Sequence, residues 1–451
     1  MEKKIKTAYV CTQCGAIYPR WQGQCNQCGE WNSLVEERII AKKHTSTPTV
    51  SEKPRRFADI GSERTAGFAS GLTEFDRVLG GGLLRGSTVL LAGEPGIGKS
   101  TLILQAAEAY ASRDLPVLYV TGEESLNQLK KRAERLHVTS ENIAVVNLTN
   151  LEEIIAIIEA GQYGVVIIDS IQTVSSGMFQ SPPGTVGQIR ESAGRLIELA
   201  RKHEIALFLI GHVTKEGVVA GPKVLEHMVD VVLNFEGDSQ YLYRLLRPIK
   251  NRYGSTLELG VFEMSPGGLN QVDNPSLLFL SQVDATARSG AVVAASCEGN
   301  RPILVEIQAL VSPASYGTPQ RVAGGLDNKR LALLLAILEK RIGIPMGGND
   351  VFVSIAGGLR LNEPAIDLAV LTAIVSSLRD LPVDVKTAVA GEVGLSGEVR
   401  AIGMAERRAA EAAKLGFEKI IMPAQTAKGI TAKQITLTGV SSLEKTLEIL
   451  F

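Results

Sequence analysis

The sequence predicts an α/β protein built on a parallel β-sheet that helices cover on both faces. Short runs of Val, Ile and Leu recur between helix-forming stretches, as in strands that are buried on both sides. These runs lie at residues 117–121, 143–147, 165–169, 206–210 and 229–233. A hydrophobic content of 45% with 45 glycines and only 5% aromatic residues agrees with this class.

Length and charge limit the possible functions. A chain of 451 residues is long enough for about three domains, each with its own core. The formal net charge of −1 gives no overall attraction for nucleic acid, so such binding must use a local patch or a channel. No apolar run approaches the roughly 18 residues of a membrane span, and the first residues lack a secretory signal, so we expect a cytoplasmic protein without a membrane partner.

The N-terminal cysteines predict a zinc site. Four of the five cysteines form two C-x-x-C pairs ten residues apart: Cys11, Cys14, Cys25 and Cys28. Gly15 and Gly29 directly follow the pairs and would permit tight turns. Four thiolates suit a closed tetrahedral Zn²⁺ site, which has no open position for catalysis, in a module too small for a core of its own. Redox or disulfide use of these cysteines is the alternative.

Changes in composition predict the domain boundaries. We expect the zinc module over residues 1–35 and a linker over 36–57, where the sequence becomes polar and rich in Lys, Ser, Thr and Pro. The α/β domain should span 58–275. Its end lies between Gln271 and Gly290, and a third domain over 285–451 should contain a strand at 303–307 and helices at 330–340 and 362–378.

A phosphate-binding motif lies between an expected strand at 87–92 and an expected helix from Thr101 to residue 110. It fits G-x-x-x-x-G-K-[ST] with the residues Gly93, Glu94, Pro95, Gly96, Ile97, Gly98, Lys99 and Ser100. The glycines would let consecutive N–H groups point at phosphate oxygens, with Lys99 on the β- and γ-phosphates and Ser100 on Mg²⁺. We therefore expect ATP and Mg²⁺ as cofactors, with Thr101 beside the phosphates. An ordinary Gly-rich turn is the alternative.

Two other expected strands end in carboxylates at the sheet edge where open α/β sheets bind ligands. Asp169 follows four hydrophobic residues and is the candidate for holding Mg²⁺ through water, the Walker B position, although it could instead be a capping Asp. Glu123 is the candidate general base, because a carboxylate there could orient a water and accept its proton. Glu124 is expected to cap the next helix, although the two glutamates could exchange roles.

Three further residues are candidates for sensing or stabilising the γ-phosphate. His212 follows the strand at 206–210 and could sense that phosphate, although a lone histidine at a strand end more often makes an ordinary hydrogen bond. Lys250 and Arg252 lie in the segment Lys-Asn-Arg-Tyr-Gly. By composition this is a solvated basic turn. In a ring, its tip could reach the γ-phosphate of a neighbour, where Arg would stabilise transition-state charge.

The order of the motifs resembles that of a known family. Residues 71–76 and 79–83, in front of the phosphate loop, resemble the opening of a RecA-family ATPase core. With the four-cysteine module before them and Lys-Asn-Arg-Tyr-Gly behind, they resemble the bacterial RadA (Sms) family of DNA repair proteins over the whole chain. The family has Phe where this chain has Tyr253, a change that keeps both cations.

The resemblance implies a hexameric ring of the DnaB helicase type. Such a ring would move on single-stranded and branched DNA and drive branch migration alongside the RecA recombinase, in the cytoplasm at the nucleoid. The resemblance supports the roles given above and makes Lys250 and Arg252 trans-acting groups. Two loops, 175–190 and 214–223, would face the channel of the ring. The cations there that could contact DNA phosphates are Arg190, Lys215 and Lys223, although ordinary surface loops are the alternative.

The C-terminal domain resembles the proteolytic domain of Lon, an α+β domain, most clearly over residues 391–407. Lon cleaves with a Ser-Lys dyad. Ala365 and Ala405 stand where the resemblance places the serine and the lysine. A methyl group can neither attack a carbonyl nor accept a proton, so we expect a domain that is proteolytically inactive and serves as a scaffold for ring assembly or duplex binding.

These observations favour an ATP-hydrolysing DNA motor. One alternative is a nucleotide-switched scaffold without translocation, as in the clock proteins of the same ATPase family. The other is an ATP-dependent protease, which the two alanines argue against.

Overall fold

The structure is a computed structural model of the chain. It describes residues 5–13, 15–40, 56, 67–179, 181–212, 222–237, 243–280, 287–314, 317–430, 432 and 434–451. The chain divides into two compact units, residues 1–256 with 260–271 and residues 257–259 with 272–451. Within the described ranges, no helix combines the length and the apolar composition that crossing a bilayer requires.

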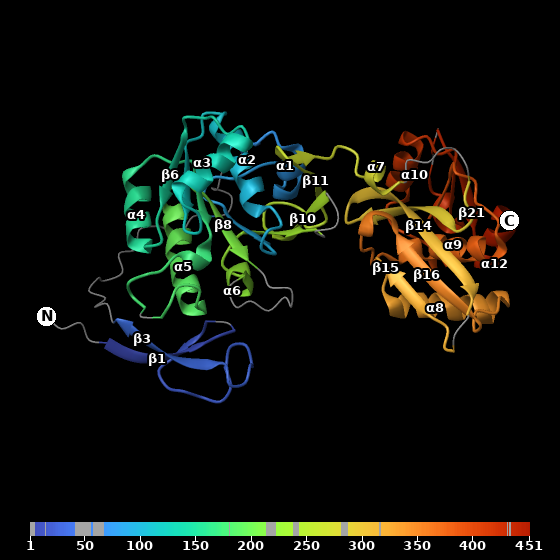
Figure 1. Cartoon of the computed structure of the whole chain (residues 1–451), viewed down its shortest axis with the longest axis horizontal. Helices are drawn as coiled ribbons and strands as arrows, with labels where there is room; N and C mark the ends of the chain where they lie inside the picture. The colour runs from blue at the N-terminus through green and yellow to red at the C-terminus, as the bar shows by residue number, and fades with distance from the viewer. Residues whose placement is uncertain are drawn as a thin grey trace. The chain divides into compact units, whose positions relative to one another are not determined.

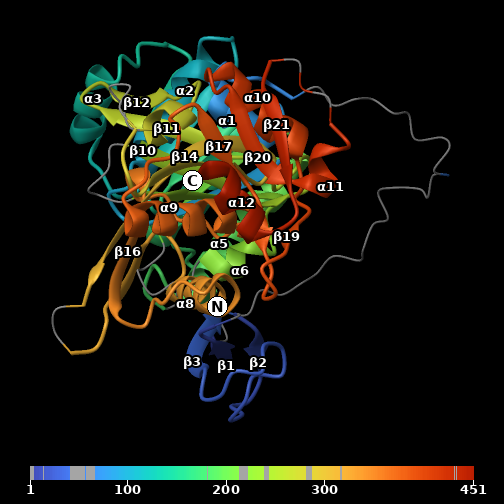
Figure 2. The same ribbon diagram turned by 90° about the vertical axis from the view of Figure 1, so that its right-hand side faces the viewer.

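The N-terminal segment folds as a three-stranded antiparallel ribbon (Figure 2). The central strand β1 (Ile5–Cys11) pairs with β2 (Ile17–Tyr18) on one side and β3 (Leu34–Ile40) on the other. The ladder between β1 and β3 runs as far as the pair Ile5 and Ile40. The ribbon therefore extends five residues into the stretch that composition assigns to a linker, because backbone pairing continues where the apolar pattern stops.

The rest of the first unit is built on a nine-stranded sheet with the order β12-β11-β10-β9-β4-β8-β7-β5-β6 (Figure 1). Six neighbouring strands are parallel: β4 (Thr88–Gly93), β5 (Val117–Thr121), β6 (Ile143–Asn147), β7 (Val165–Asp169), β8 (Ala206–His212) and β9 (Val231–Glu236). Three antiparallel strands extend the sheet beside β9: β10 (Tyr243–Asn251), β11 (Gly260–Ser265) and β12 (Gly268–Gln271). The sequence patterns described above do not predict this antiparallel part, which the short connections between its strands require.

Helices cover both faces of this sheet, as the continuous apolar strands predict. One face packs against α1 (Thr73–Leu79), α2 (Lys99–Ala111) and α3 (Leu126–Arg135). The other packs against α4 (Leu151–Ala160), α5 (Val186–Lys202) and α6 (Pro222–Glu226), with the short turn η2 (Ile171–Thr173) nearby. Successive residues of each central strand enter different cores: Tyr119 joins the first core, and its neighbours Leu118 and Val120 join the second.

The second unit contains a seven-stranded mixed sheet with the order β15-β16-β14-β13-β17-β20-β21 and a separate two-stranded ribbon. The strands are β13 (Ala291–Glu298), β14 (Arg301–Pro313), β15 (Arg321–Gly324), β16 (Asn349–Ile355), β17 (Thr387–Val389), β18 (Glu392–Val393), β19 (Val399–Arg400), β20 (Lys419–Pro423) and β21 (Thr436–Val440). The helices and turns are α7 (Ser276–Phe279), α8 (Asn328–Ile337), η3 (Leu338–Ile342), η4 (Ala356–Gly358), η5 (Pro364–Ile366), α9 (Asp367–Arg379), α10 (Ala405–Lys414), α11 (Ala424–Ala427) and α12 (Leu443–Leu450).

The helix expected at 362–378 differs from the observed one at its start. Asn362 lies outside any helix, Glu363 is extended, Pro364 opens the single turn η5, and α9 begins only at Asp367. Proline disfavours helical backbone in the residue before it, which explains the later start. The helix expected at 330–340 is α8, which begins two residues earlier and passes into the π-helical turn η3.

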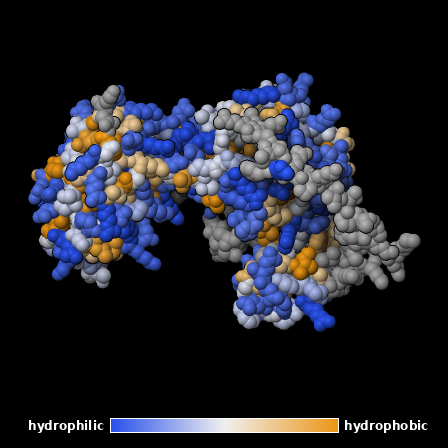
Figure 3. Space-filling model, turned by 180° about the vertical axis from the view of Figure 1, so that it is seen from behind, coloured by the Kyte–Doolittle hydropathy of each residue, from blue (hydrophilic) through white to orange (hydrophobic). Residues whose placement is uncertain are grey.

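The surface does not show a broad apolar area on the face seen in Figure 3. Hydrophilic residues dominate that face, and hydrophobic residues form small separate patches on each unit. Scattered apolar side chains of this kind are normal on a protein surface.

Candidate functional site

The phosphate-binding motif has the local structure that the sequence predicts. β4 ends at Gly93, and the loop leads directly into α2 at Lys99. Gly96 and Gly98 have φ angles of +78° and +113°, which favour glycine. At Gly93, the requirement for glycine comes from a close contact and not from the turn of the loop. A Cβ at this position would lie 2.5 Å from the carbonyl oxygen of Phe235 on β9. Close strand packing therefore requires the first glycine.

Lys99 is a buried cation that forms no direct ion pair with any residue that the structure describes. The residue is 3% exposed, and its Nζ donates to the carbonyl oxygens of Gly93 (2.8 Å) and Glu94 (2.9 Å) and to His212 Nδ1 (3.1 Å). Burial lowers the pKa of Lys99 to about 8, although the charges of Asp169 and Glu123 oppose this shift. An anion that enters the loop would gain a strong partner in this ammonium group.

His212 connects Lys99 to Glu123. Its Nε2 lies 2.9 Å from Glu123 Oε1. Because Nδ1 accepts from the Lys99 ammonium, we assign the ring proton to Nε2, which donates to the Glu123 carboxylate. Glu123 also accepts a hydrogen bond from Ser170 Oγ. The hydrogen bond from His212 is the largest cause that lowers the pKa of Glu123, to about 2, so Glu123 is ionised at neutral pH.

Glu124 does not cap the following helix, so that prediction is wrong. Ser125 is the N-cap of α3 and forms a capping box with Gln128. Glu124 instead pairs with Arg132, with 2.5 Å between the charged atoms. The two glutamates are therefore in different environments, and only Glu123 is hydrogen-bonded to Ser170 and His212.

Asp169 has the features of a metal-binding carboxylate. The residue is 6% exposed, and its Oδ2 accepts from Tyr119 Oη at 2.6 Å. Its Oδ1 is buried and has no hydrogen-bond partner in the described part of the chain. Burial raises the pKa of Asp169, and hydrogen bonds from Tyr119 and Ser100 oppose the shift. An unpartnered buried oxygen on a carboxylate that also interacts with Ser100 fits a Mg²⁺ ion or its water ligand.

Lys250 and Arg252 do not form a fully solvated turn. Lys250 is in the last part of β10, and its Nζ donates to the carbonyl oxygens of Glu226 (2.7 Å) and Val229 (2.8 Å) near the end of α6. The Arg252 side chain is 52% exposed, and its Nη1 lies 3.0 Å from Asp230 Oδ1. Lys250 thus stabilises its own chain, whereas the Arg252 guanidinium is at the surface.

Asp230 holds Arg252 in place and was not identified from the sequence. One carboxylate oxygen accepts from Thr88 N (3.1 Å) and Thr88 Oγ1 (2.7 Å), and the other accepts from Arg201 and Arg252. Burial disfavours the ionised form, but these hydrogen bonds and the two arginines outweigh it and lower the pKa of Asp230. An acidic residue next to an apolar strand run was the available signal, because such a group must find partners when it is buried.

The predicted DNA contacts fall on three different kinds of position. Arg190 belongs to the second turn of α5, not to a loop, and its Nη1 donates to the Gly15 carbonyl of the ribbon at 2.6 Å. Lys215 and the side chain of Lys223 lie outside the described residues. The loop before α5 is fixed by the buried side chain of Gln188, which bonds to Ser176 and other backbone groups. The loop expected over 175–190 is therefore shorter and more tightly held than composition suggests.

Three of the four predicted zinc ligands converge in the ribbon. The sulfur atoms of Cys11, Cys25 and Cys28 lie within 4.8 Å of one another, and Cys14 lies outside the described residues. The Cys11 and Cys28 sulfurs are 3.6 Å apart, too far for a disulfide but close to the roughly 3.8 Å between two thiolates on one tetrahedral zinc. Gly15 and Gly29 donate their amides to the carbonyls of Cys11 and Cys25 in two matching turns.

Comparison with known proteins agrees with this arrangement. Residues 9–36 match the family described as a rubredoxin metal binding domain, and residues 53–218 match the AAA domain family. The chain is 46% identical to the DNA repair protein RadA of Bacillus subtilis, with 98% of each chain covered. It is 48% identical to the RadA protein of Pseudomonas aeruginosa over 99% of each, and 44% identical to that of Escherichia coli over 100% of this chain and 99% of the other.

The chain belongs to the RadA family of DNA repair proteins. The predicted zinc ribbon, ATPase core and Lon-like domain are confirmed, and so are the cofactors ATP, Mg²⁺ and Zn²⁺. When bound, Mg²⁺ would neutralise phosphate charge, and the residues that fit it are Ser100 and Asp169.

The C-terminal domain of this RadA family member matches the Lon protease C-terminal proteolytic domain over residues 347–448. Ala365 is buried in η5, and Ala405 is the first residue of α10. On the same helix as Ala405, Arg408 is 2% exposed and forms an ion pair with Glu363, the residue before η5. Arg408 also donates to the carbonyls of Ala295 (2.6 Å) and Gly403 (3.0 Å). Arginine stays protonated in proteins, so Arg408 cannot replace the missing lysine as a base.

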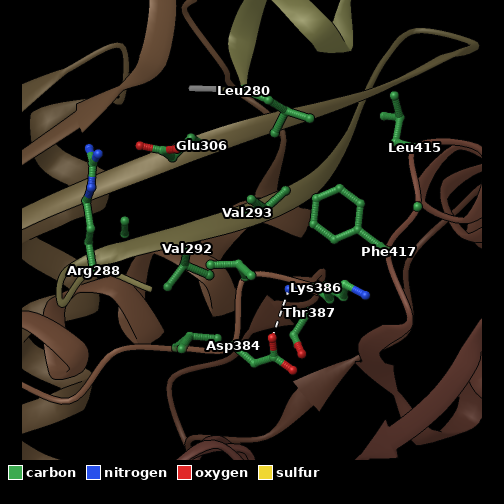
Figure 4. Close-up of a pocket in the computed structure, with 14 residues that line it drawn as sticks. Leu280, Arg288, Val292, Val293, Glu306, Asp384, Lys386, Thr387, Leu415 and Phe417 are labelled. Carbon is green, nitrogen blue, oxygen red and sulfur yellow. Dashed lines mark hydrogen bonds between the residues drawn. The ribbon is translucent and has the colours of Figure 1, made fainter. Parts of the chain in front are cut away.

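A cavity of about 310 Å³ opens elsewhere in this domain (Figure 4). Val293, Leu415 and Phe417 form its apolar part, and charged side chains including Arg288 and Asp384 lie around it. No serine lines the cavity within the described residues, and the one lysine there, Lys386, pairs through Nζ with Glu418. This cavity therefore lacks the serine and the free amine of a Lon-type dyad.

Proposed function

We propose that this chain is an ATP-driven motor that acts as a hexameric ring on single-stranded and branched DNA. In this proposal, it promotes branch migration during recombination alongside RecA and is associated with the nucleoid. ATP hydrolysis uses Glu123 as general base, His212 as γ-phosphate sensor and Asp169 with Ser100 at Mg²⁺. Lys215 and Lys223 are the proposed DNA-contacting cations. Arg190 is a weaker candidate, because the ribbon already accepts its hydrogen bond.

The observation that carries the proposal is the place of Arg252 relative to its own phosphate loop. The loop follows Gly93 at the carboxyl end of β4, whereas Asp230 holds Arg252 beside Thr88 at the amino end of the same strand. The two ends are separated by five residues, or roughly 16 Å of extended strand. Arg252 therefore cannot reach the nucleotide of its own subunit. A surface arginine held by a buried carboxylate is suited to a neighbouring subunit's phosphate.

The contacts of His212 support coupling of hydrolysis to movement. His212 touches both Lys99 and Glu123, so a γ-phosphate that draws Lys99 toward itself removes the bond to Nδ1. The histidine would then be free to reorient. A residue that contacts both the phosphate-binding cation and the base, and that directly precedes a candidate DNA loop in the sequence, is suited to transmit the nucleotide state.

The test is subunit mixing. Lys99→Ala and Arg252→Ala proteins are each expected to lack DNA-stimulated ATP hydrolysis. Mixed in equal amounts, they should recover about one quarter of wild-type activity, because half of the intact phosphate loops would face an intact arginine from a random neighbour. Strand displacement on a forked oligonucleotide is measured in the same mixtures.

Arg77→Ala serves as the matched control, since Arg77 is a surface arginine paired with Glu74 on α1. In a mixture of the Arg77→Ala and Lys99→Ala proteins, the ATPase activity should equal that of the Arg77→Ala subunits alone. If Arg252→Ala alone hydrolyses ATP normally, the trans role is wrong. Hydrolysis could instead need Arg252 and yet show no stimulation by DNA and no strand displacement. In that case the nucleotide-switched scaffold is the better description.

We further propose that the C-terminal domain does not cleave peptides. Ala365, Ala405 and the closed pair of Arg408 with Glu363 support this. Incubation with unfolded casein and ATP should release no peptides beyond the level seen with Lys99→Ala. ATP-dependent peptide release by the wild-type protein would contradict the motor proposal in favour of a protease.

A further inference from the structure

A buried tyrosine contacts the proposed magnesium ligand. Tyr119 is fully buried in the middle of β5, and its hydroxyl donates to Asp169 Oδ2 at 2.6 Å. Burial raises the pKa of Tyr119 well above its ordinary value, so the hydroxyl remains protonated and acts as a donor. In the sequence, Tyr119 is one residue of the apolar run at 117–121, and no motif assigns it a function.

The sheet geometry places the two side chains on the same face. β5 and β7 are adjacent and parallel, with Thr121 opposite Asp169 and Tyr119 opposite Ile167. Tyr119 is thus a diagonal neighbour of Asp169, and side chains two residues apart on a strand share one face. This face packs against α2, which begins with Lys99 and Ser100. The hydroxyl therefore approaches Asp169 from the sheet side, beneath the phosphate-binding loop.

The two oxygens of Asp169 have different environments. Oδ2 accepts the tyrosine hydrogen bond, and buried Oδ1 has no partner among the described residues. Without the hydroxyl, the carboxylate could turn to other angles about its terminal side-chain torsion at little cost, because this torsion is broad, and neither oxygen would be held at the position of the cation. With the hydroxyl, one oxygen is fixed and the other is left for the cation.

We propose that Tyr119 is a positioning residue that fixes the Asp169 carboxylate so that Oδ1 is presented to the magnesium of bound nucleotide. The inference rests on Asp169 as the magnesium ligand and is independent of the ring, the DNA and the trans arginine. Partners of this kind, which hold a metal ligand without touching the metal, change metal affinity or activity by about 10- to 100-fold when removed.

The test is nucleotide binding by Tyr119→Phe as a function of Mg²⁺, followed with a fluorescent ATP analogue and no DNA. The Mg²⁺ concentration for half-maximal binding is expected to rise by about 10-fold, while binding of the analogue in EDTA stays as in the wild type. Equal Mg²⁺ dependence in the variant and the wild type would overturn the proposal. Weaker binding in EDTA to the same degree would also overturn it, since that result indicates a general change in the pocket.

Tyr110→Phe is the matched control. Tyr110 is 1% exposed on α2 in the same core, and its hydroxyl has no hydrogen-bond partner within the described chain. Its removal should leave the Mg²⁺ dependence unchanged. A shift equal to that of Tyr119→Phe would show that loss of any buried hydroxyl from this core has the effect, which contradicts the proposal.

A double-mutant cycle identifies the path of the effect. In an Asp169→Asn background, which already weakens Mg²⁺ binding, Tyr119→Phe should add no further change. An additive loss would mean that Tyr119 acts without Asp169 and would overturn the proposal. Thermal unfolding of each variant confirms folding. Failure of the motor proposal would appear only in the DNA and mixing experiments, so the two results are separable.

Discussion

Lys99 and Arg408 are both buried cations, but their partners differ in kind. Lys99, in the ATPase core, donates to two carbonyls and an imidazole and has no carboxylate within hydrogen-bonding distance among the described residues. Arg408, in the Lon-like domain, forms an ion pair with Glu363 and donates to two carbonyls. A buried charge is costly unless it is compensated. At Lys99, the charge is left for a bound anion to compensate. At Arg408, the carboxylate of Glu363 compensates the charge within the protein.

The zinc ribbon is the opposite case, in which Cys11, Cys25 and Cys28 converge as ligands for a cation, and it offers the largest expected effect. Chelation of zinc, or Cys25→Ser, should unfold the ribbon, because structural zinc contributes on the order of 10 kcal/mol to folding of such modules. Elemental analysis should find one zinc per chain in the native protein and much less in the variant. An unfolded ribbon in a variant that still contains one zinc per chain would contradict the assignment of these cysteines as zinc ligands. ATP hydrolysis without DNA should persist, since the ATPase core has its own apolar clusters.

Lys99→Ala should lower ATP hydrolysis by at least about 100-fold, because a preorganised donor to phosphate charge is removed from a buried site. The same change should leave the melting temperature equal or higher, since the free protein loses a cation whose pKa burial depresses. Turnover at saturating ATP and thermal unfolding without nucleotide are the two measurements. A large fall in the melting temperature would mean that Lys99 is a structural cation like Arg408.

Arg408→Met should have the opposite pattern. It leaves Glu363 partly buried without its cation, which typically costs about 3–5 kcal/mol of unfolding free energy. ATP hydrolysis per folded molecule should stay near wild type. Replacing both partners, with Glu363→Leu added, should recover much of the loss, because no uncompensated charge remains. Denaturant unfolding of the second unit measures this, and a double variant less stable than the single one would refute the explanation.

The smallest expected effect is on pH dependence. Since Lys99 has a pKa of about 8 in the free protein and bound phosphates raise it, nucleotide binding takes up a proton at higher pH. Affinity should therefore be nearly constant below about pH 7 and fall at higher pH, by about threefold between pH 7.5 and 8.5. Titration calorimetry in buffers of different ionisation enthalpy at pH 8.5 should report net proton uptake. Proton release, or rising affinity with pH, would show that the sign is wrong.

Much of the fold and of the site could be predicted from the sequence because the signals are local. The phosphate loop needs only a strand, three glycines and a helix in order, and the zinc ribbon needs only two spaced cysteine pairs. Asp169 could be found because it ends an apolar run. Glu123 and Glu124 could not be distinguished, since only folding shows that Ser125 caps α3 and that Glu123 contacts His212.

The sequence by itself determined which chemical groups the protein carries and which segment carries each, since these follow from residue type and spacing along the chain. Only the tertiary structure decided which groups meet. It brought Tyr119 beneath Asp169 and Asp230 between Thr88 and Arg252, and it closed Arg408 onto Glu363. These contacts join residues 22 to 142 positions apart along the chain. Strand order and the burial of charge create these contacts, and a local sequence pattern predicts neither property.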